Sequence, residues 1–119
     1  IPSDEEFTEL RDFLGGESVA GYAMKSTSGW NDGGNGSNSS GFTGLPGGYR
    51  GPGGFGNIGR SGFWWSASES DSDSWARALH SFQGEADDPY DIIKNIPNDH
   101  VMRDFTHREH GYSARCVRD

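Results

Sequence analysis

The feature that most constrains the fold is a stretch of turn-forming residues, 26–62, that large side chains interrupt at intervals. Its segment 29–41 is so rich in Gly, Asn and Ser that composition alone would indicate a flexible linker. A linker has no need of apolar rings, yet this stretch contains Trp30, Phe42, Leu45, Tyr49, Phe55 and Ile58. We therefore expect a long ordered loop that these side chains pin to the rest of the domain.

The composition of the whole chain supports a small core built from rings. Only 31% of the 119 residues are hydrophobic and the mean hydropathy is −0.79, but 13% are aromatic and 19 residues are Gly. The aromatic content excludes ordinary disorder, and the glycines follow no three-residue collagen period. The length allows one domain, residues 1–119, whose few large rings each bury much apolar surface.

The charge and the cysteine count exclude several classes of protein. Ten basic residues against 18 acidic ones give a net charge of −8, which disfavours nucleic acid as a partner and suits an extracellular surface. The single cysteine, Cys116, cannot form a disulfide within the chain. No apolar run is long enough to span a membrane. The chain begins at Ile1 without Met, so we expect a processed or excised piece.

Residues 3–14 are the clearest helix in the sequence. Ser3 and Glu6 have the spacing of a capping box, and Gly15 with Gly16 supplies a left-handed stop. The side chains expected to pack on a sheet are Phe7, Leu10, Phe13 and Leu14.

Three short segments have the composition or alternation of strands: 63–68, 75–82 and 111–118. In the last, Tyr112, Ala114 and Cys116 share one face. Between the second and third lies 84–110, a charged insertion whose 91–96 piece is compatible with a helical turn. The predicted class is α+β, with the N-terminal helix packed on a small twisted antiparallel sheet and long ordered Gly-rich loops.

Five blocks in chain order resemble a known family, the Fibrobacter succinogenes major paralogous domain of bacterial surface and secreted proteins. They are PSDEEF at 2–7, KSTSGWN at 25–31, GFTGLPGGYR at 41–50, GFWWSASE at 62–69 and GYSARCVRD at 111–119. The resemblance implies an extracellular or cell-surface location and a C-type-lectin-like fold. Family members usually carry a further N-terminal portion with a cysteine, so we expect that this portion, and the partner of Cys116, are missing here.

Catalysis is not indicated by the sequence. The histidines His80, His100, His107 and His110 form only chance combinations with the many serines, without a nucleophile motif. The lectin-like superfamily includes enzymes that use paired cysteines, which the single Cys116 cannot reproduce. We therefore expect a protein that is not an enzyme.

Two groups of residues are candidate metal ligands. Glu69, Asp71 and Asp73 place carboxylates at alternate positions, as Ca²⁺ prefers, although a hairpin turn with solvated acids explains the same pattern. His107 and His110 would share a face of a helix, together with Asp104 and Glu109, but a solvated charged turn is the simpler interpretation.

The tryptophans have two interpretations. Trp30, Trp64, Trp65, Trp75 and Tyr49 could form a platform on which sugar rings stack, or they could supply the core of a chain with few aliphatic residues. Because neighbours in a strand point to opposite faces, one of Trp64 and Trp65 should be buried and the other left for a surface contact.

The predicted function is a non-enzymatic module that binds a protein or glycan ligand through 66–76 and 84–110. The candidate contacts are Trp65, Glu69, Asp71, Asp73, Trp75, Arg77, Tyr90, Arg103 and Arg108. The alternative is a structural subunit of a surface filament or stalk, assembled from copies of itself with elements donated by a neighbour.

Overall fold

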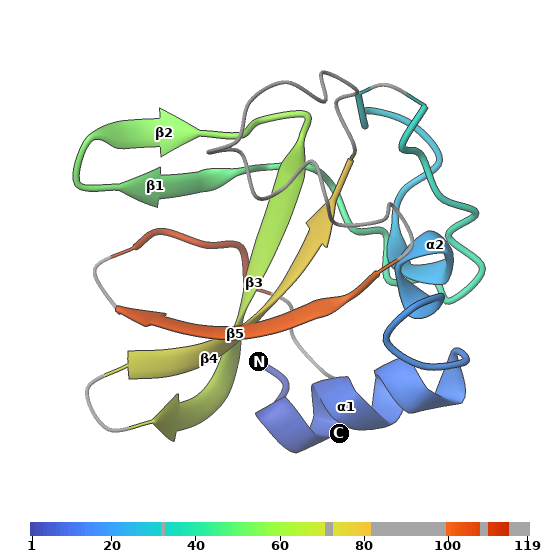
Figure 1. The fold of residues 1–119 in the computed structure, drawn as a ribbon, viewed down its shortest axis with the longest axis horizontal. Helices are drawn as coiled ribbons and strands as arrows, with labels where there is room; N and C mark the ends of the chain where they lie inside the picture. The colour runs from blue at the N-terminus through green and yellow to red at the C-terminus, as the bar shows by residue number, and fades with distance from the viewer. Residues whose placement is uncertain (32, 71–72, 82–99, 108–109, 115–119) are drawn as a thin grey trace.

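The computed structural model describes residues 1–31, 33–70, 73–81, 100–107 and 110–114. Over these residues the elements are, in order, α1 (Asp4–Phe13), α2 (Ala20–Met24), β1 (Tyr49–Gly51), β2 (Gly54–Gly56), β3 (Ser61–Ser70), β4 (Asp73–His80) and β5 (Met102–His107). The strands form an antiparallel β1-β2 hairpin and an antiparallel sheet of order β3-β4-β5 (Figure 1). The predicted α+β class is confirmed. No helix in these ranges is both long and apolar enough to cross a bilayer.

Helix α1 begins as its sequence predicts. Ser3 Oγ accepts a hydrogen bond from the Glu6 backbone N–H, and Glu6 Oε1 accepts one from the Ser3 N–H, both at 3.1 Å. Phe7 is buried, and Leu10 and Leu14 pack against the core. The prediction that Phe13 joins this stripe is wrong, since its side chain is 86% exposed. At about 100° per residue, Leu14 lies within ~20° of Phe7 around the helix, whereas Phe13 lies ~120° away.

The three-stranded sheet differs from the prediction in its last member. The predicted strands at 63–68 and 75–82 correspond to β3 and β4. The third strand is β5, from within the segment interpreted as a charged insertion, whereas Gly111 and Ser113 make only isolated bridges, to Arg50 and Trp64. This strand was not predicted, because its charged residues suggested a solvated segment. In the structure Arg103 instead forms an ion pair with Asp4 of α1, far away in the sequence. The predicted turn at 91–96, and Cys116, lie outside the described residues.

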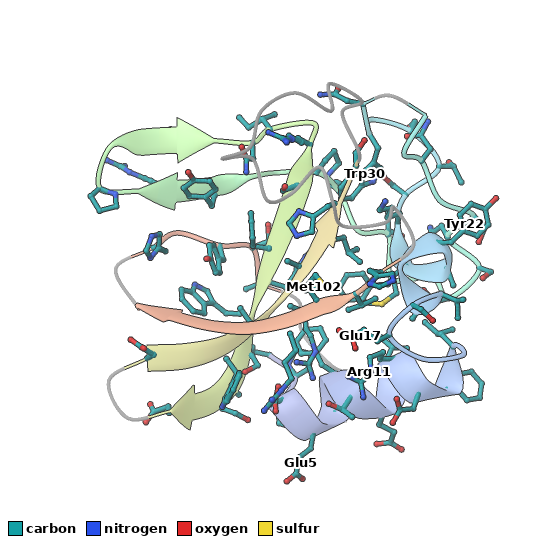
Figure 2. All side chains as sticks on the ribbon, viewed as in Figure 1. Glu5, Arg11, Glu17, Tyr22, Trp30 and Met102 are labelled. Carbon is teal, nitrogen blue, oxygen red and sulfur yellow. The ribbon has the colours of Figure 1, made fainter. Side chains whose placement is uncertain are left out.

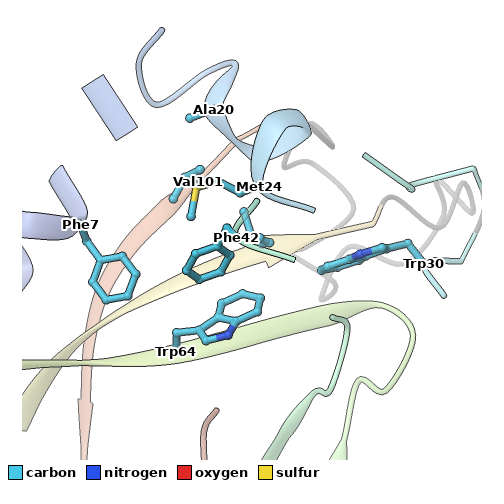
Figure 3. Packing of buried hydrophobic residues seen from close by; sticks show 8 residues of the cluster. Phe7, Ala20, Met24, Trp30, Phe42, Trp64 and Val101 are labelled. Atoms are coloured by element: carbon cyan, nitrogen blue, oxygen red, sulfur yellow. The ribbon is translucent and has the colours of Figure 1, made fainter. Parts of the chain in front are cut away.

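The two faces of this sheet have different neighbours. Strand pairing aligns Trp64 with Arg77 and Arg77 with Arg103, so the three share a face, and α1 contacts β3 and β4 on it. The core lies here: Phe42 packs edge-to-face on Phe7, with 6.4 Å between ring centroids, and on Trp64, at 5.4 Å (Figure 3). Alternation directs Phe63 and Trp65 to the opposite face.

The long loop is ordered, but fewer of its large side chains are buried than predicted. Trp30 and Phe42 belong to the core, and the Trp30 indole Nε1 donates to the Gly44 carbonyl at 3.0 Å. The prediction is wrong for three side chains that are exposed, namely Leu45, Phe55 and Ile58. Main-chain hydrogen bonds hold that part of the loop instead, among them Gly48 N–H to Ser61 O at 2.7 Å and Gly59 N–H to Pro46 O at 2.8 Å.

Gly62 shows how closely the backbone approaches these rings. A Cβ at this position would lie 2.5 Å from Trp64 Cη2 and 2.7 Å from the Leu45 carbonyl oxygen. The indole of Trp64 therefore occupies the volume that any larger residue at 62 would need.

We expect Gly62→Ala to lower the free energy of unfolding by about 1–3 kcal/mol, because the added methyl must displace a buried indole or a carbonyl. Gly53→Ala is the matched control, since its Cβ would meet no atom within 4 Å. Chemical denaturation of both variants measures the difference. Equal stability of the two would contradict the close contact at Gly62.

Candidate functional site

The predicted ligand contacts do not form one surface. Trp65 lies on the face away from α1, whereas Trp75, Arg77 and Arg103 lie on the α1 side. Glu69 is exposed near the end of β3, and Asp73 is half-buried at the start of β4. The remaining three, Asp71, Tyr90 and Arg108, lie outside the described residues.

Arg77 is a buried anchor for α1. Its side chain is only 2% exposed, and its Nη2 donates to the Asp4 carbonyl at 2.9 Å and to Thr8 Oγ1 at 2.7 Å. Nη1 lies 2.8 Å from Asp4 Oδ1, so the two side chains form an ion pair beneath the helix. The prediction of Arg77 as a ligand contact is wrong, because the helix covers its guanidinium.

Arg103 is the second arginine that pairs with Asp4, and it lies at the surface. We call Asp4, Arg77 and Arg103 the ion pair network. Its Nε and Nη2 donate to both carboxylate oxygens of Asp4 at 2.7–3.0 Å, and its Cζ lies 3.6 Å from the ring centroid of Trp75. These hydrogen bonds, with the charges of Arg77 and Arg103, lower the pKa of Asp4 against the opposing effect of desolvation. Asp4 therefore stays ionised, and Arg103 and Trp75 are engaged within the domain.

We expect Asp4→Asn to destabilise the domain by about 3 kcal/mol, because it leaves the buried guanidinium of Arg77 without its counter-charge. Glu5→Gln is the matched control: the side chain is next in sequence but points away from the sheet (Figure 2), and its loss should cost at most about 0.5–1 kcal/mol. Denaturant unfolding measures both. If Asp4→Asn lowered the free energy of unfolding no more than Glu5→Gln does, the network would contribute little to stability.

Ser61 and His80 are the one close Ser–His pair in the part of the chain that the structure describes. Ser61 Oγ lies 2.8 Å from His80 Nδ1, with exposed fractions of 0% and 4%, and Lys25 Nζ donates to the His80 carbonyl. Burial, followed by the charges of Lys25 and Arg60, lowers the pKa of His80 to about 4. The imidazole is thus neutral and inside the core, where a substrate does not reach it.

The buried imidazole makes stability depend on pH. The unfolded chain binds a proton near pH 6.5, whereas the folded pKa of His80 is about 4, so its contribution is full above 6.5 and declines as pH falls towards 4. At pH 5 the loss should be about 2 kcal/mol. His80→Gln should flatten this slope in denaturation curves measured from pH 7.5 to 4. Asp4 acts in a separate window, because its contribution is lost only below its ordinary pKa of 3.8. A slope that survives in His80→Gln would refute the assignment.

The face away from α1 carries a cluster of stacked rings, which we call the aromatic cluster. Tyr112 stacks on Phe63 at 4.9 Å between centroids and contacts Trp65 at 4.5 Å, and Tyr49 meets Phe63 edge-to-face at 5.7 Å. The ring of His80 also contacts Phe63, and the ring of His110 contacts both Tyr49 and Tyr112. The rings come from β1, β3, β4 and 110–112, and their mutual contacts fix their orientation.

An open groove of about 310 Å³ lies beside this cluster. Its lining residues are Gly47, Gly48, Tyr49, Arg50, Phe55, Gly111, Tyr112 and Ser113. Two main-chain hydrogen bonds between Arg50 and Gly111, at 2.7 and 2.8 Å, join its two walls. Phe55 is 75% exposed, and Arg50 Cζ lies 5.3 Å from its ring centroid. The groove offers ring faces, one cation and exposed backbone to a ligand, at the lower end of the usual size range of ~300–1,000 Å³.

Sequence reasoning identified only part of this groove. Of the residues of the sugar-platform interpretation, Tyr49 lines the groove, whereas Trp30 and Trp64 are buried in the core, as the alternative interpretation predicted. It missed Arg50 and Phe55 as site residues. The run Gly51-Pro52-Gly53-Gly54 between two short aromatic segments was the available signal, since it is typical of a hairpin turn.

The metal predictions gain no support from the geometry. Among the described residues, no three His, Cys, Asp or Glu side chains are grouped so as to hold a metal ion. His107 and Asp104 lie in strand β5, so the prediction that His107 and His110 share a helix face is wrong. Glu109, like Asp71 of the carboxylate group, is not among the described residues.

The family is decided by a match over nearly the whole chain. Residues 1–118 match the model of the Fibrobacter succinogenes major domain. The chain belongs to this family. The match to the Fibrobacter succinogenes major domain confirms the resemblance seen in the five sequence blocks. No curated protein and no solved structure matches the chain, so the lectin-like arrangement remains a prediction.

Proposed function

We propose that this domain is a non-enzymatic binding module, displayed outside the cell or on its surface, whose protein or glycan ligand occupies the groove. The observation that carries this proposal is the open, ring-lined groove between the β1-β2 hairpin and residues 111–113, beside the aromatic cluster. The acidic net charge and the surface and secreted proteins in which the family occurs support the location.

The groove is built to bind without large rearrangement. Tyr112 packs against both Phe63 and Trp65, and Tyr49 packs against Phe63, so the two tyrosines that line the groove are already oriented. A rigid site loses little conformational entropy when a ligand binds. Phe55 presents a largely exposed ring at its edge, which is apolar surface that a ligand would remove from water.

A structural role in a filament is the competing proposal. Among the described residues β5 pairs only with β4, so its outer edge has main-chain groups that a strand of a neighbouring copy could pair with. Light scattering separates the two roles: concentration-dependent assembly supports the filament, whereas a monomer that binds ligand supports the groove.

We expect Phe55→Ala to weaken binding of the ligands captured by the wild-type domain on glycan and surface-protein arrays, by about tenfold or more, because an aromatic contact in a groove contributes ~1–3 kcal/mol. Phe13→Ala is the matched control, since it removes an equally large and even more exposed ring from α1. Both variants should melt at the wild-type temperature. Equal loss in the two variants, or undiminished binding by Phe55→Ala, would exclude the groove as the binding site.

Calcium remains a separate proposal for the hairpin that carries Glu69, Asp71 and Asp73. Oxygen ligands at alternate positions support it on chemical grounds alone. Bound calcium should raise the melting temperature relative to the domain in chelator. An unchanged melting temperature at millimolar calcium would rule out calcium binding at this hairpin.

A further inference from the structure

Arg50 sets the electrostatic character of the groove. It is the single charged side chain among the described lining residues, in a chain whose net charge is −8. Arg11 pairs with Asp12 at 3.1 Å, and Arg77 and Arg103 pair with Asp4. Within the described residues Arg50 has no acidic partner, and its guanidinium lies over the ring of Phe55. An anionic group on a ligand would supply such a partner.

The chemistry of a guanidinium narrows the ligand. Its planar fork of N–H donors matches a carboxylate, which it binds through two parallel hydrogen bonds. The acidic surface elsewhere repels polyanions in general, so a local anionic group seated at Arg50 fits better than a long, densely charged chain such as a nucleic acid.

The walls of the groove favour a sugar ring over a polypeptide. Phe55 offers a largely exposed apolar ring, and Gly47, where a Cβ would meet only Ser113 Oγ at 3.7 Å, leaves the backbone open to a ring. Ser113 is exposed, and its Oγ makes no hydrogen bond to another described residue, so it can bond a sugar hydroxyl. A peptide could not add to β1 as a strand, because β2 and Gly111 occupy its two edges.

We propose that the groove binds a single uronic acid unit of a glycan, with the carboxylate on Arg50 and the pyranose ring against Phe55 and Tyr112. This inference rests on the proposed function and names the chemical class of its ligand. The aromatic rings of the groove would bind charged and neutral sugars alike. The contact between the carboxylate and Arg50 is therefore what selects a uronic acid.

Titration calorimetry with short oligomers of galacturonic, glucuronic and mannuronic acid, each paired with its methyl ester, tests the proposal. At least one acid should bind about tenfold or more tightly than its ester, which keeps the ring but loses the charge. Arg50→Gln should reduce affinity for that acid by about the same factor and leave the ester unchanged. Arg11→Gln, which removes a surface arginine paired with Asp12, should bind as the wild type does. Affinity for the acid should also fall as salt is raised.

Several outcomes would overturn the inference. They are equal affinity for acid and ester, undiminished binding by Arg50→Gln, binding of none of the acids, and tighter binding of a peptide with a free C-terminal carboxylate than of any uronate. The proposed function is judged separately, by whether Phe55→Ala loses whatever ligand the arrays reveal. A neutral sugar or protein lost from Phe55→Ala would retain the groove as the site while rejecting uronic acid.

Discussion

The ion pair network of Asp4 fixes which side of the sheet the helix α1 covers. A single carboxylate in the first turn of α1 binds Arg77 of β4 and Arg103 of β5, so it fastens the helix across two strands at once. With α1 fixed there, Phe7 packs on Phe42, which in turn packs on Trp64. The rings on the opposite face, Phe63 and Trp65, belong to the aromatic cluster beside the groove. The position of the candidate binding site is therefore a consequence of where the helix is tied.

Local signals in the sequence predicted the elements that depend on local interactions. The capping box of Ser3 and Glu6 predicted the start of α1, and the aromatic run around Trp64 predicted β3. Strand β5 could not be recognised, because Arg103 and its neighbours look like a solvated charged segment until their partner is known. For the same reason the sequence predicted the buried side chains of the long loop only in part. Burial of a ring such as Phe42 depends on distant neighbours, and Phe55 has the same local composition but no such neighbours.

The candidate site was harder to predict than the fold. Its walls come from the hairpin around Arg50 and from residues near Tyr112, which are about half the chain apart and meet through main-chain hydrogen bonds. Main-chain pairing carries little side-chain signature, so nothing in the sequence placed Gly111 beside Arg50. Of the predicted contacts that the structure describes, Trp65 alone belongs to the aromatic cluster, while Arg77 and Arg103 bind the helix residue Asp4. Membership of the Fibrobacter succinogenes major domain family identifies the domain without naming a ligand.

The contact between Asp4 and Arg103 also has a kinetic consequence, because the two residues are 99 positions apart. Closing so long a loop costs chain entropy before any contact compensates for it, and domains dominated by such contacts fold slowly. During synthesis, α1 leaves the ribosome first but cannot be fixed in place until β5 has followed. The nascent chain must therefore keep the apolar face around Phe7 from aggregating until nearly all of the domain has been made.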